Sequence, residues 1–122
     1  MTINIRILYV DDEEELRFLV ENQLTTEGFF VETADDGDTA IKMLKENSYD
    51  IILLDIRMPR VNVIEVLKYI KKQKLNTRVI MLTAVDDLSV ALEAVKNGAI
   101  DYLTKPYEFE TLIKAIQRVV AK

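Results

Sequence analysis

Residues 50–59 read DIILLDIRMP, and this stretch decides the fold. Four apolar residues, 51–54, run without interruption and end on one carboxylate, Asp55. A short run that is apolar at every position is typical of a strand buried on both faces, as in the middle of a parallel sheet. The isoleucines and Pro59 favour a strand over a turn of buried helix. Because a charge inside such a strand is costly, we expect Asp55 at its end, in a solvated crevice where it can react.

The composition indicates one soluble globular domain, residues 1–122. Hydrophobic residues make up 49% of the 122-residue chain and charged residues 30%, which is ordinary for such a domain. No apolar run reaches the roughly 18 residues of a membrane span, and the first residues lack the apolar core of a signal peptide. We therefore expect a cytoplasmic protein that does not contact the membrane.

Several residue types are missing, and their absence excludes whole classes of function. The sequence has no Cys and no His, so thiolate nucleophiles, Cys-based zinc sites, Ser-His pairs and a phosphohistidine of its own are excluded. Its three glycines, Gly28, Gly37 and Gly98, are too far apart for a phosphate loop or a dinucleotide turn. A net charge of −5 argues against nucleic-acid binding by this domain alone.

Strand-like and helix-like segments alternate along the whole chain. The strand-like runs are residues 6–10, 29–34, 51–54, 78–83 and 100–104. Helices are expected at residues 14–27, 62–73 and 108–121, with one that opens at Asp36–Asp38 and ends at Asn47, and one that starts at Asp86 or Asp87 and ends before Gly98. The expected core-facing residues of this fourth helix are Leu88, Ala91, Leu92 and Val95. Right-handed connections between such βα units give a parallel sheet with helices on both faces, a three-layer α/β/α sandwich.

Polar residues follow four of the five predicted strands. The first strand ends on Asp11 and Asp12, the third on Asp55, the fourth on Thr83 and the fifth on Lys105. In an open parallel sheet the carboxyl ends of the strands share one edge, and ligands bind there. We therefore expect these residues, which are scattered over most of the sequence, to lie close together.

Three carboxylates at one edge would repel each other, since a pair at about 4 Å costs roughly 4 kcal/mol at an intermediate dielectric constant. An oxygen-only set of this kind suits Mg²⁺, which is commonly shared between carboxylates and phosphate oxygens. Lys105 adds a positive charge and Thr83 a hydroxyl donor, and both could neutralise a phosphoryl group during transfer. Since a carboxylate can itself be the nucleophile, the pattern predicts Mg²⁺-dependent phosphoryl transfer onto Asp55.

The motifs at these strand ends resemble those of response-regulator receiver domains in two-component signalling. The resemblance rests on VDDEEE after the first strand, LLDIRMP at the third, LTA at the fourth and YLTKP at the fifth, in the expected order. It implies a flavodoxin-like fold with strand order 2-1-3-4-5. It also implies that Asp12, Asp55 and the backbone carbonyl of Arg57 bind Mg²⁺ directly, with Asp11 acting through water.

By the same resemblance, Asp55 is the phosphoacceptor, and Thr83 and Lys105 contact the phosphoryl group. Thr83 and Tyr102 are the implied switch residues that change the surface of the fourth helix, last strand and last helix. The implied partners are a histidine kinase or a histidine phosphotransfer protein, an output domain or downstream protein, and a second copy bound through that surface. Val63 stands where the family commonly has Gly.

Other interpretations of the same residues are simpler. Asp11 to Glu15 could be an acidic helix start, and Asp55 a loop residue or a helix cap. Thr83 could be a cap or an ordinary strand residue, Tyr102 a half-buried strand residue, and Lys105 a surface lysine. One rival function is a small Mg²⁺-dependent phosphatase with an Asp nucleophile, and others are an FMN carrier and a receiver that never takes up phosphate. The phosphatase needs DxDx[TV] after the first strand and the FMN carrier a glycine-rich loop, whereas this chain has DDEEE there. We expect a signalling domain that catalyses only its own phosphorylation and dephosphorylation, and not an enzyme.

Overall fold

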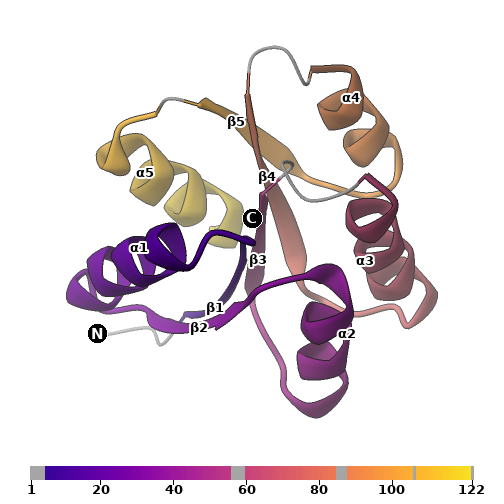
Figure 1. Ribbon diagram of the computed structural model, residues 1–122, viewed down its shortest axis with the longest axis horizontal. Coiled ribbons are helices and arrows are strands. Elements are labelled where there is room, and N and C mark those ends of the chain that lie inside the picture. The colour runs from indigo at the N-terminus through magenta and orange to yellow at the C-terminus, as the bar shows by residue number, and fades with distance from the viewer. Residues whose placement is uncertain (1–4, 56–59, 85–87, 106, 122) are drawn as a thin grey trace.

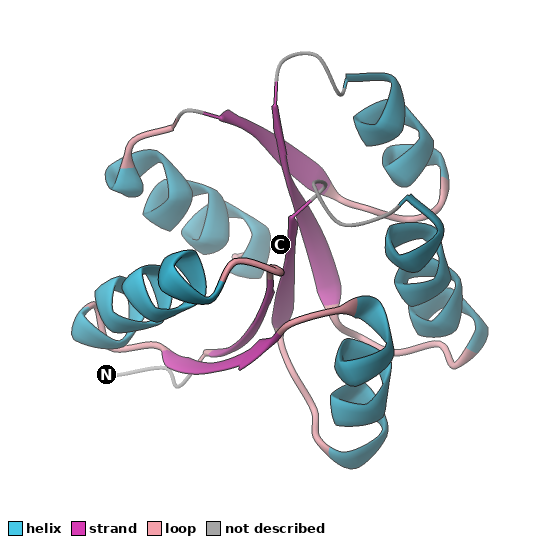
Figure 2. Cartoon of the chain, viewed as in Figure 1, coloured by secondary structure: helices cyan, strands magenta, loops and turns pink. Residues whose placement is uncertain are grey.

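The structure is a computed structural model, and it describes residues 5–55, 60–84, 88–105 and 107–121. Within these residues the side chains of 60–62, 83, 84, 88–91 and 105 are outside the description. Strands and helices alternate, and helices lie on both sides of a single twisted sheet (Figures 1 and 2). The predicted three-layer sandwich is therefore confirmed.

Each strand in the described part of the chain is followed by a helix, as expected. The strands are β1 (Arg6–Val10), β2 (Phe30–Ala34), β3 (Ile51–Asp55), β4 (Arg78–Ala84) and β5 (Asp101–Lys105). The helices are α1 (Glu14–Thr26), α2 (Gly37–Glu46), α3 (Arg60–Lys72), α4 (Leu88–Lys96) and α5 (Phe109–Val120). Most predicted boundaries differ from these by one or two residues.

The strands form one parallel sheet in the order β2-β1-β3-β4-β5. This is the order that the family resemblance implies, and it places β3 at the centre. The apolar run of residues 51–54 is fully buried, so the sheet is covered on both faces at this strand. A strand covered on both faces needs an apolar side chain at every position, which is why the run has no alternating polar residue.

Alternate residues of the strands feed two separate apolar layers. Leu8, Ile52 and Met81 pack with α2, α3 and α4 on one face, while Ile7, Leu53 and Leu82 pack with α1 and α5 on the other. Figure 1 shows these two groups of helices on opposite sides of the sheet. Because the side-chain period of a strand is two, residues 7, 9 and 11 of the first strand region and residues 51, 53 and 55 of the third belong to the α1–α5 side.

Two helix ends depend on glycine, as the sequence predicts. Gly28 follows α1 with a φ of 97° and Gly98 follows α4 with a φ of 112°. These left-handed conformations are costly for other residues, so each glycine allows the chain to turn back toward the next strand. At the start of α2, the Asp36 carboxylate accepts a hydrogen bond from the Thr39 backbone N–H at 2.8 Å, which confirms its capping role.

Two expectations about the helices were wrong in detail. Leu92 and Val95 of α4 were expected to face the core, but 61% and 44% of their surface is exposed, and among the described side chains of this helix, residues 92–96, the buried one is Ala94. The small Ala94 lets α4 lie close to β4 and turns the larger residues outward. Helix α3 begins at Arg60, two residues earlier than expected, and Val63 in its first turn is fully buried among core residues.

Candidate functional site

The strand register brings the predicted acidic residues to the same level of the sheet. Val10 pairs with Leu54, so Asp11 and Asp55 are the next residues on neighbouring strands. Asp55 in turn pairs with Leu82, the residue before Thr83. Both acids also belong to the α1–α5 side of their strands by alternation. Residues 44 positions apart in sequence therefore meet at the carboxyl edge of the sheet, which is the edge where the strands end.

Asp11 and Asp55 are buried completely, and within the described residues they are the buried charged side chains. Two tyrosines, Tyr9 and Tyr107, lie close enough to interact electrostatically with both carboxylates. Burial first, and then the charges of Asp55 and Asp11, raise the pKa of Tyr107 to about 12. Burial and the hydrogen bond to Asp11 raise the pKa of Tyr9 well above its usual value, with a further contribution from Asp55. The carboxyl edge thus concentrates negative charge in a place with little solvent.

The Asp11 carboxylate has a defined orientation because both of its oxygens accept hydrogen bonds. The Tyr9 hydroxyl donates to Oδ2 at 2.6 Å, and the backbone N–H of Glu13 donates to Oδ1 at 2.9 Å. The second bond also satisfies an amide at the start of α1, whose first turn carries Glu14 and Glu15. Asp11 therefore fixes the entry into α1 as well as facing the carboxyl edge.

The three predicted acidic residues differ in how far their side chains are buried. Asp12 is exposed, whereas Asp11 and Asp55 are fully buried. Where residues are described, no three acidic side chains are grouped closely enough to hold a metal ion. The expected crowding thus applies to two of the three carboxylates. Two buried carboxylates still fit Mg²⁺, which is usually held by one or two carboxylates together with phosphate oxygens and water.

The other predicted site residues are located by backbone alone or not at all. Thr83 pairs with Thr104, and Ala84 pairs with Lys105. Thr83 therefore lies at the carboxyl end of β4, and Lys105 at the carboxyl end of β5. Their side chains are not described, and Arg57, Asp86 and Asp87 lie outside the described residues. The Tyr102 side chain is 39% exposed on β5, and its backbone N–H donates a hydrogen bond to the Asp101 carboxylate.

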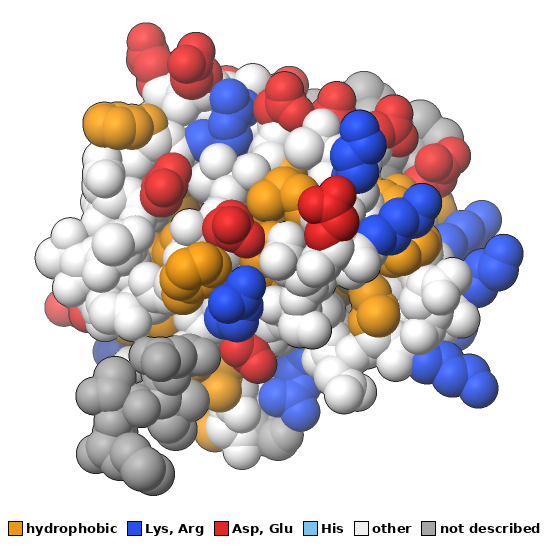
Figure 3. All heavy atoms as spheres, turned by 90° about the horizontal axis from the view of Figure 1, so that it is seen from below, with side chains coloured by type: hydrophobic (Ala, Val, Ile, Leu, Met, Phe, Trp, Pro, Cys, Tyr) orange, Lys and Arg blue, Asp and Glu red, His pale blue; other side chains and the backbone are white. Residues whose placement is uncertain are grey.

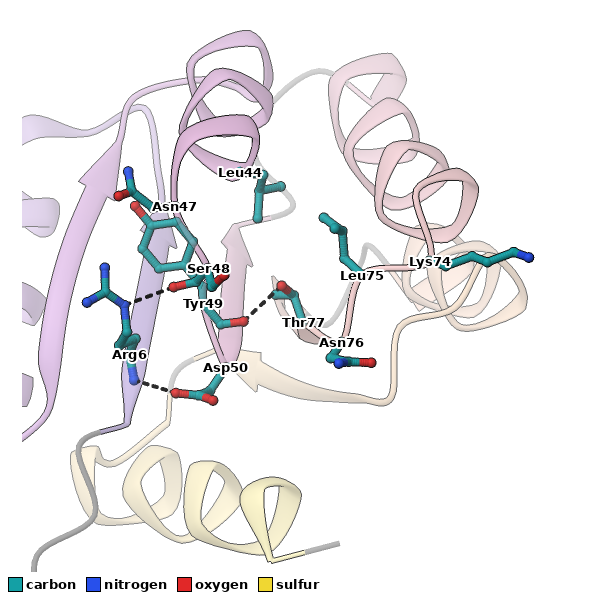
Figure 4. A pocket seen from close by; sticks show the side chains of 10 residues that line it. All are labelled: Arg6, Leu44, Asn47, Ser48, Tyr49, Asp50, Lys74, Leu75, Asn76 and Thr77. Carbon is teal, nitrogen blue, oxygen red and sulfur yellow. Dashed lines mark hydrogen bonds between the residues drawn. The ribbon is translucent and has the colours of Figure 1, made fainter.

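A hollow of about 400 Å³ lies at the opposite, amino edge of the sheet and is lined by residues from turns (Figure 4). The Arg6 backbone N–H donates to the Asp50 carboxylate at 2.8 Å, and its side chain donates to the Ser48 carbonyl at 2.9 Å. Thr77 donates to the Tyr49 carbonyl at 2.9 Å. These hydrogen bonds connect the segments that lead into β1, β3 and β4, so the polar groups named here have structural partners.

Comparison with known proteins decides between the candidate functions. Residues 7–117 match the family model of the response regulator receiver domain. The chain belongs to this family. Receiver domains act in phosphorylation-based signalling, so the rival interpretation as a phosphatase is not supported. They are signalling domains rather than classical enzymes, and they are generally Mg²⁺-dependent.

Individual relatives cover the receiver along nearly its whole length. It is 40% identical to PhoP of Bacillus subtilis, a transcriptional regulatory protein of alkaline phosphatase synthesis, over 95% of this chain and 50% of that protein. It is 34% identical to the chemotaxis protein CheY of the same organism, over 94% of this chain and 97% of that one. The solved receiver domain of the Francisella response regulator 1452 superposes with a TM-score of 0.86 at 33% identity, covering 97% and 98% of the two chains.

The lengths of these relatives differ from that of the receiver. The chain spans about a quarter to a half of the length of the first curated relatives that it matches. None of the helices in the described residues is both long and apolar enough to cross a membrane.

Sequence reasoning missed two residues of the carboxyl edge, Tyr9 and Tyr107. Tyr9 lies inside the apolar run RILYV and was counted as an ordinary strand residue. The available signal was its spacing: two positions before Asp11 in a strand, it shares a face with that carboxylate. Tyr107 follows the LTKP motif, and nothing in its local sequence indicates that it lies near Asp55.

Proposed function

We propose that Asp55 is the residue that accepts the phosphoryl group in this receiver. Its carboxylate ends the central strand, lies at the carboxyl edge and is fully buried, and it is near enough to Tyr107 for its charge to raise the pKa of that tyrosine. A carboxylate that keeps little water is a better nucleophile than one in bulk solvent, provided that a cation offsets its charge. The single observation that carries the proposal is this burial of Asp55 level with Asp11 at the end of β3.

Mg²⁺ is the cation that fits these residues. The donors are oxygen atoms only, since the chain has neither His nor Cys, and oxygen donors suit a hard cation. We propose that Asp55, Asp12 and the Arg57 carbonyl hold the ion and that Asp11 acts through water. When bound, the ion supplies positive charge that offsets the carboxylates and the phosphoryl oxygens.

The transfer itself requires little of the protein beyond positioning. One carboxylate oxygen of Asp55 forms the O–P bond while the P–N bond to the histidine of a partner breaks, and the electron pair stays on that nitrogen. Thr83 and Lys105 contact the phosphoryl oxygens from the ends of β4 and β5, where the register supports their roles. Water later attacks the phosphorus and releases phosphate, so the domain catalyses its own phosphorylation and dephosphorylation.

Phosphorylation with a small donor tests the assignment of Asp55. The purified chain is incubated with acetyl phosphate and Mg²⁺, and the intact mass is expected to increase by one alkali-labile phosphoryl group. The Asp55→Asn variant should show no increase. Asp50→Asn is the matched control, because Asp50 precedes the same strand at the opposite edge, and this variant should be phosphorylated normally. Persistent labelling of Asp55→Asn would contradict the proposal.

We further propose that phosphorylation is read at the surface formed by α4, β5 and α5. This surface exposes 61% of Leu92, 43% of Ile100 and 39% of Tyr102. Exposed apolar residues gathered on neighbouring elements are typical of a protein interface. Thr83 and Tyr102 are the proposed switch residues, and the partner is an output domain, a downstream protein or a second copy of the chain. A Leu92→Glu variant should be phosphorylated normally but lose this association, as measured by light scattering with and without acetyl phosphate.

A histidine that donates the phosphoryl group must lie outside residues 1–122, because this domain has no histidine. A histidine kinase or a histidine phosphotransfer protein fits this role, and a cytoplasmic location follows from the ATP that such a kinase needs. The domain, residues 1–122, is not proposed to bind nucleic acid or membrane by itself. Its net charge is −5, and on the face seen in Figure 3 acidic side chains gather along one margin while hydrophobic ones form small separate spots.

A further inference from the structure

Tyr9 is a polar residue in the middle of an apolar layer. It lies in β1, is fully buried, and is the largest of the completely buried side chains. The other fully buried residues of the layer between the sheet and α1 and α5 are aliphatic, such as Leu53 and Leu82. A phenylalanine would fill the same volume without a hydroxyl that must find a partner in the core. The position of this hydroxyl therefore calls for an explanation.

The hydroxyl is directed at one of the two buried acids. It donates to Oδ2 of Asp11 at 2.6 Å, a distance typical of a strong hydrogen bond to a carboxylate. The arrangement follows from the strand, because residues 9 and 11 lie on the same face of an extended chain. The Tyr9 hydroxyl therefore approaches Asp11 from inside the apolar core, whereas a ligand would approach the carboxyl edge from the solvent.

Asp11 is held by every polar group that it has. Besides the bonds from Tyr9 and Glu13 to its carboxylate, its backbone N–H donates to the Ala34 carbonyl at 3.1 Å. Its own carbonyl accepts from the Arg17 guanidinium at 2.6 Å. Each carboxylate oxygen has a second lone pair, so a fixed Asp11 can still accept from one further donor at each oxygen. The carboxylate is therefore oriented before any ion arrives.

We propose that Tyr9 is a positioning residue for the Mg²⁺ site: its hydroxyl holds the Asp11 carboxylate in the orientation in which it serves the ion. This inference rests on the proposed function, in which Asp11 supports the ion through water. Groups that hydrogen-bond the ligands of a metal fix their direction, and their loss commonly weakens metal binding about tenfold or more. Tyr9 has this relation to Asp11, and its depth in the core keeps solvent from competing for the bond.

The same chain provides a matched control in Tyr49. Tyr49 is 4% exposed, and its hydroxyl donates to the carboxylate of Glu32. This second pair of tyrosine and carboxylate lies at the amino edge, beside the hollow shown in Figure 4 and away from Asp55. Removing either hydroxyl with a Tyr→Phe substitution deletes one tyrosine–carboxylate hydrogen bond and keeps the ring. The two variants differ in which edge of the sheet loses its bond.

The experiment measures Mg²⁺ affinity in the wild type, Tyr9→Phe and Tyr49→Phe by titration calorimetry and by amide chemical shifts. We expect Tyr9→Phe to raise the dissociation constant about tenfold and Tyr49→Phe to leave it unchanged. Urea unfolding of both variants shows how much stability each hydroxyl contributes. A purely structural role predicts that stability falls in both variants while Mg²⁺ affinity falls in neither.

A double-mutant cycle with Asp11→Asn makes the test specific to the pair. If Tyr9 acts through Asp11, adding Tyr9→Phe to Asp11→Asn should weaken Mg²⁺ binding no further. Equal affinities for the wild type and Tyr9→Phe, or equal losses from Tyr9→Phe with and without Asp11, would overturn the inference. A wild type that binds no Mg²⁺ would instead contradict the proposed function, so the two failures are distinguishable.

Discussion

The two edges of the sheet contain similar chemical groups but use them differently. Each has a buried tyrosine that donates to a carboxylate, Tyr9 to Asp11 at the carboxyl edge and Tyr49 to Glu32 at the amino edge. At the amino edge a cation completes the set, since the Arg6 guanidinium lies 4.5 Å from the centre of the Phe30 ring and 5.8 Å from that of Tyr49. At the carboxyl edge two acids, Asp11 and Asp55, are buried completely.

The difference indicates which edge stabilises the fold and which edge reacts. Burying a charge is costly, so buried charges persist only where the fold or the function requires them. At the amino edge, Arg6 donates to the Asp50 carboxylate and to the Ser48 carbonyl, so these groups already have partners within the protein. The carboxyl edge is completed by an ion and a phosphoryl group, and the free energy of the folded protein should respond to both.

A substitution in the middle of β3 should disturb both edges, because this strand connects them. Leu53 is fully buried in the layer under α1 and α5, and Leu53→Ala leaves a cavity there. We expect the free energy of unfolding to fall by about 2–5 kcal/mol, measured by urea denaturation. The control is Phe18→Ala, whose side chain is 68% exposed and which should change stability by about 0.5 kcal/mol or less. Similar losses from the two variants would mean that β3 is not the centre of the core.

Mg²⁺ should stabilise the carboxyl edge and leave the amino edge unaffected. At about a hundredfold excess over its dissociation constant, an ion that binds only the folded state adds about 2.7 kcal/mol to the free energy of unfolding. Asp55→Asn should lose most of this gain, because it removes a proposed ligand of the ion. Asp50→Asn should keep the full gain. Thermal denaturation with and without Mg²⁺ measures both, and equal gains in the two variants would remove the distinction between the edges.

The central features of this fold could be predicted from the sequence because they depend on local patterns. The apolar run before Asp55 requires a strand covered on both faces. Gly28 and Gly98 mark helix ends, because they adopt a left-handed conformation that is costly for other residues. The polar residues at strand ends then follow from the geometry of a parallel sheet. These features can be predicted from a single sequence, because they depend on neighbouring residues or on the general geometry of a parallel sheet.

The parts that could not be predicted depend on contacts between distant residues. The outward position of Leu92 is set by how closely α4 packs through Ala94, which its apolar pattern does not reveal. The partnership of Tyr9 with Asp11 depends on a rotamer in a buried layer, and the position of Tyr107 depends on how the chain leaves β5. Charge alone also failed to separate exposed Asp12 from buried Asp11.

Not every acid at the carboxyl edge is expected to serve the reaction, and Asp36 tests this point. It follows β2, and hydrogen bonds from Thr39 hold the pKa of its carboxylate below the usual value. Because the folded state favours the charged form, this contribution is present above pH 4 or so and is lost as the pH falls through the lowered pKa. Asp36→Ala should lower the free energy of unfolding by about 0.5–2 kcal/mol at neutral pH. It should also make that free energy depend less on pH in the acidic range. It should leave Mg²⁺ affinity unchanged, and a weaker affinity would place Asp36 with the site.

The smallest effect is expected from the ionisation of the tyrosines, which should not alter the stability of the protein near neutral pH. Burial raises the pKa of Tyr107 to about 12, with the charges of Asp55 and Asp11 adding to it, whereas at Tyr49 burial and Glu32 raise the pKa. Since the folded state favours the neutral phenol, its contribution to stability is complete below the ordinary value of 10.0 and is lost as the pH rises toward 12. Asp55→Asn should lower the pKa of Tyr107 toward 10.0 and leave that of Tyr49 unchanged, as followed by NMR of isotope-labelled tyrosine rings. An unchanged Tyr107 would show that burial alone sets its pKa and that Asp55 adds little charge to the space around it.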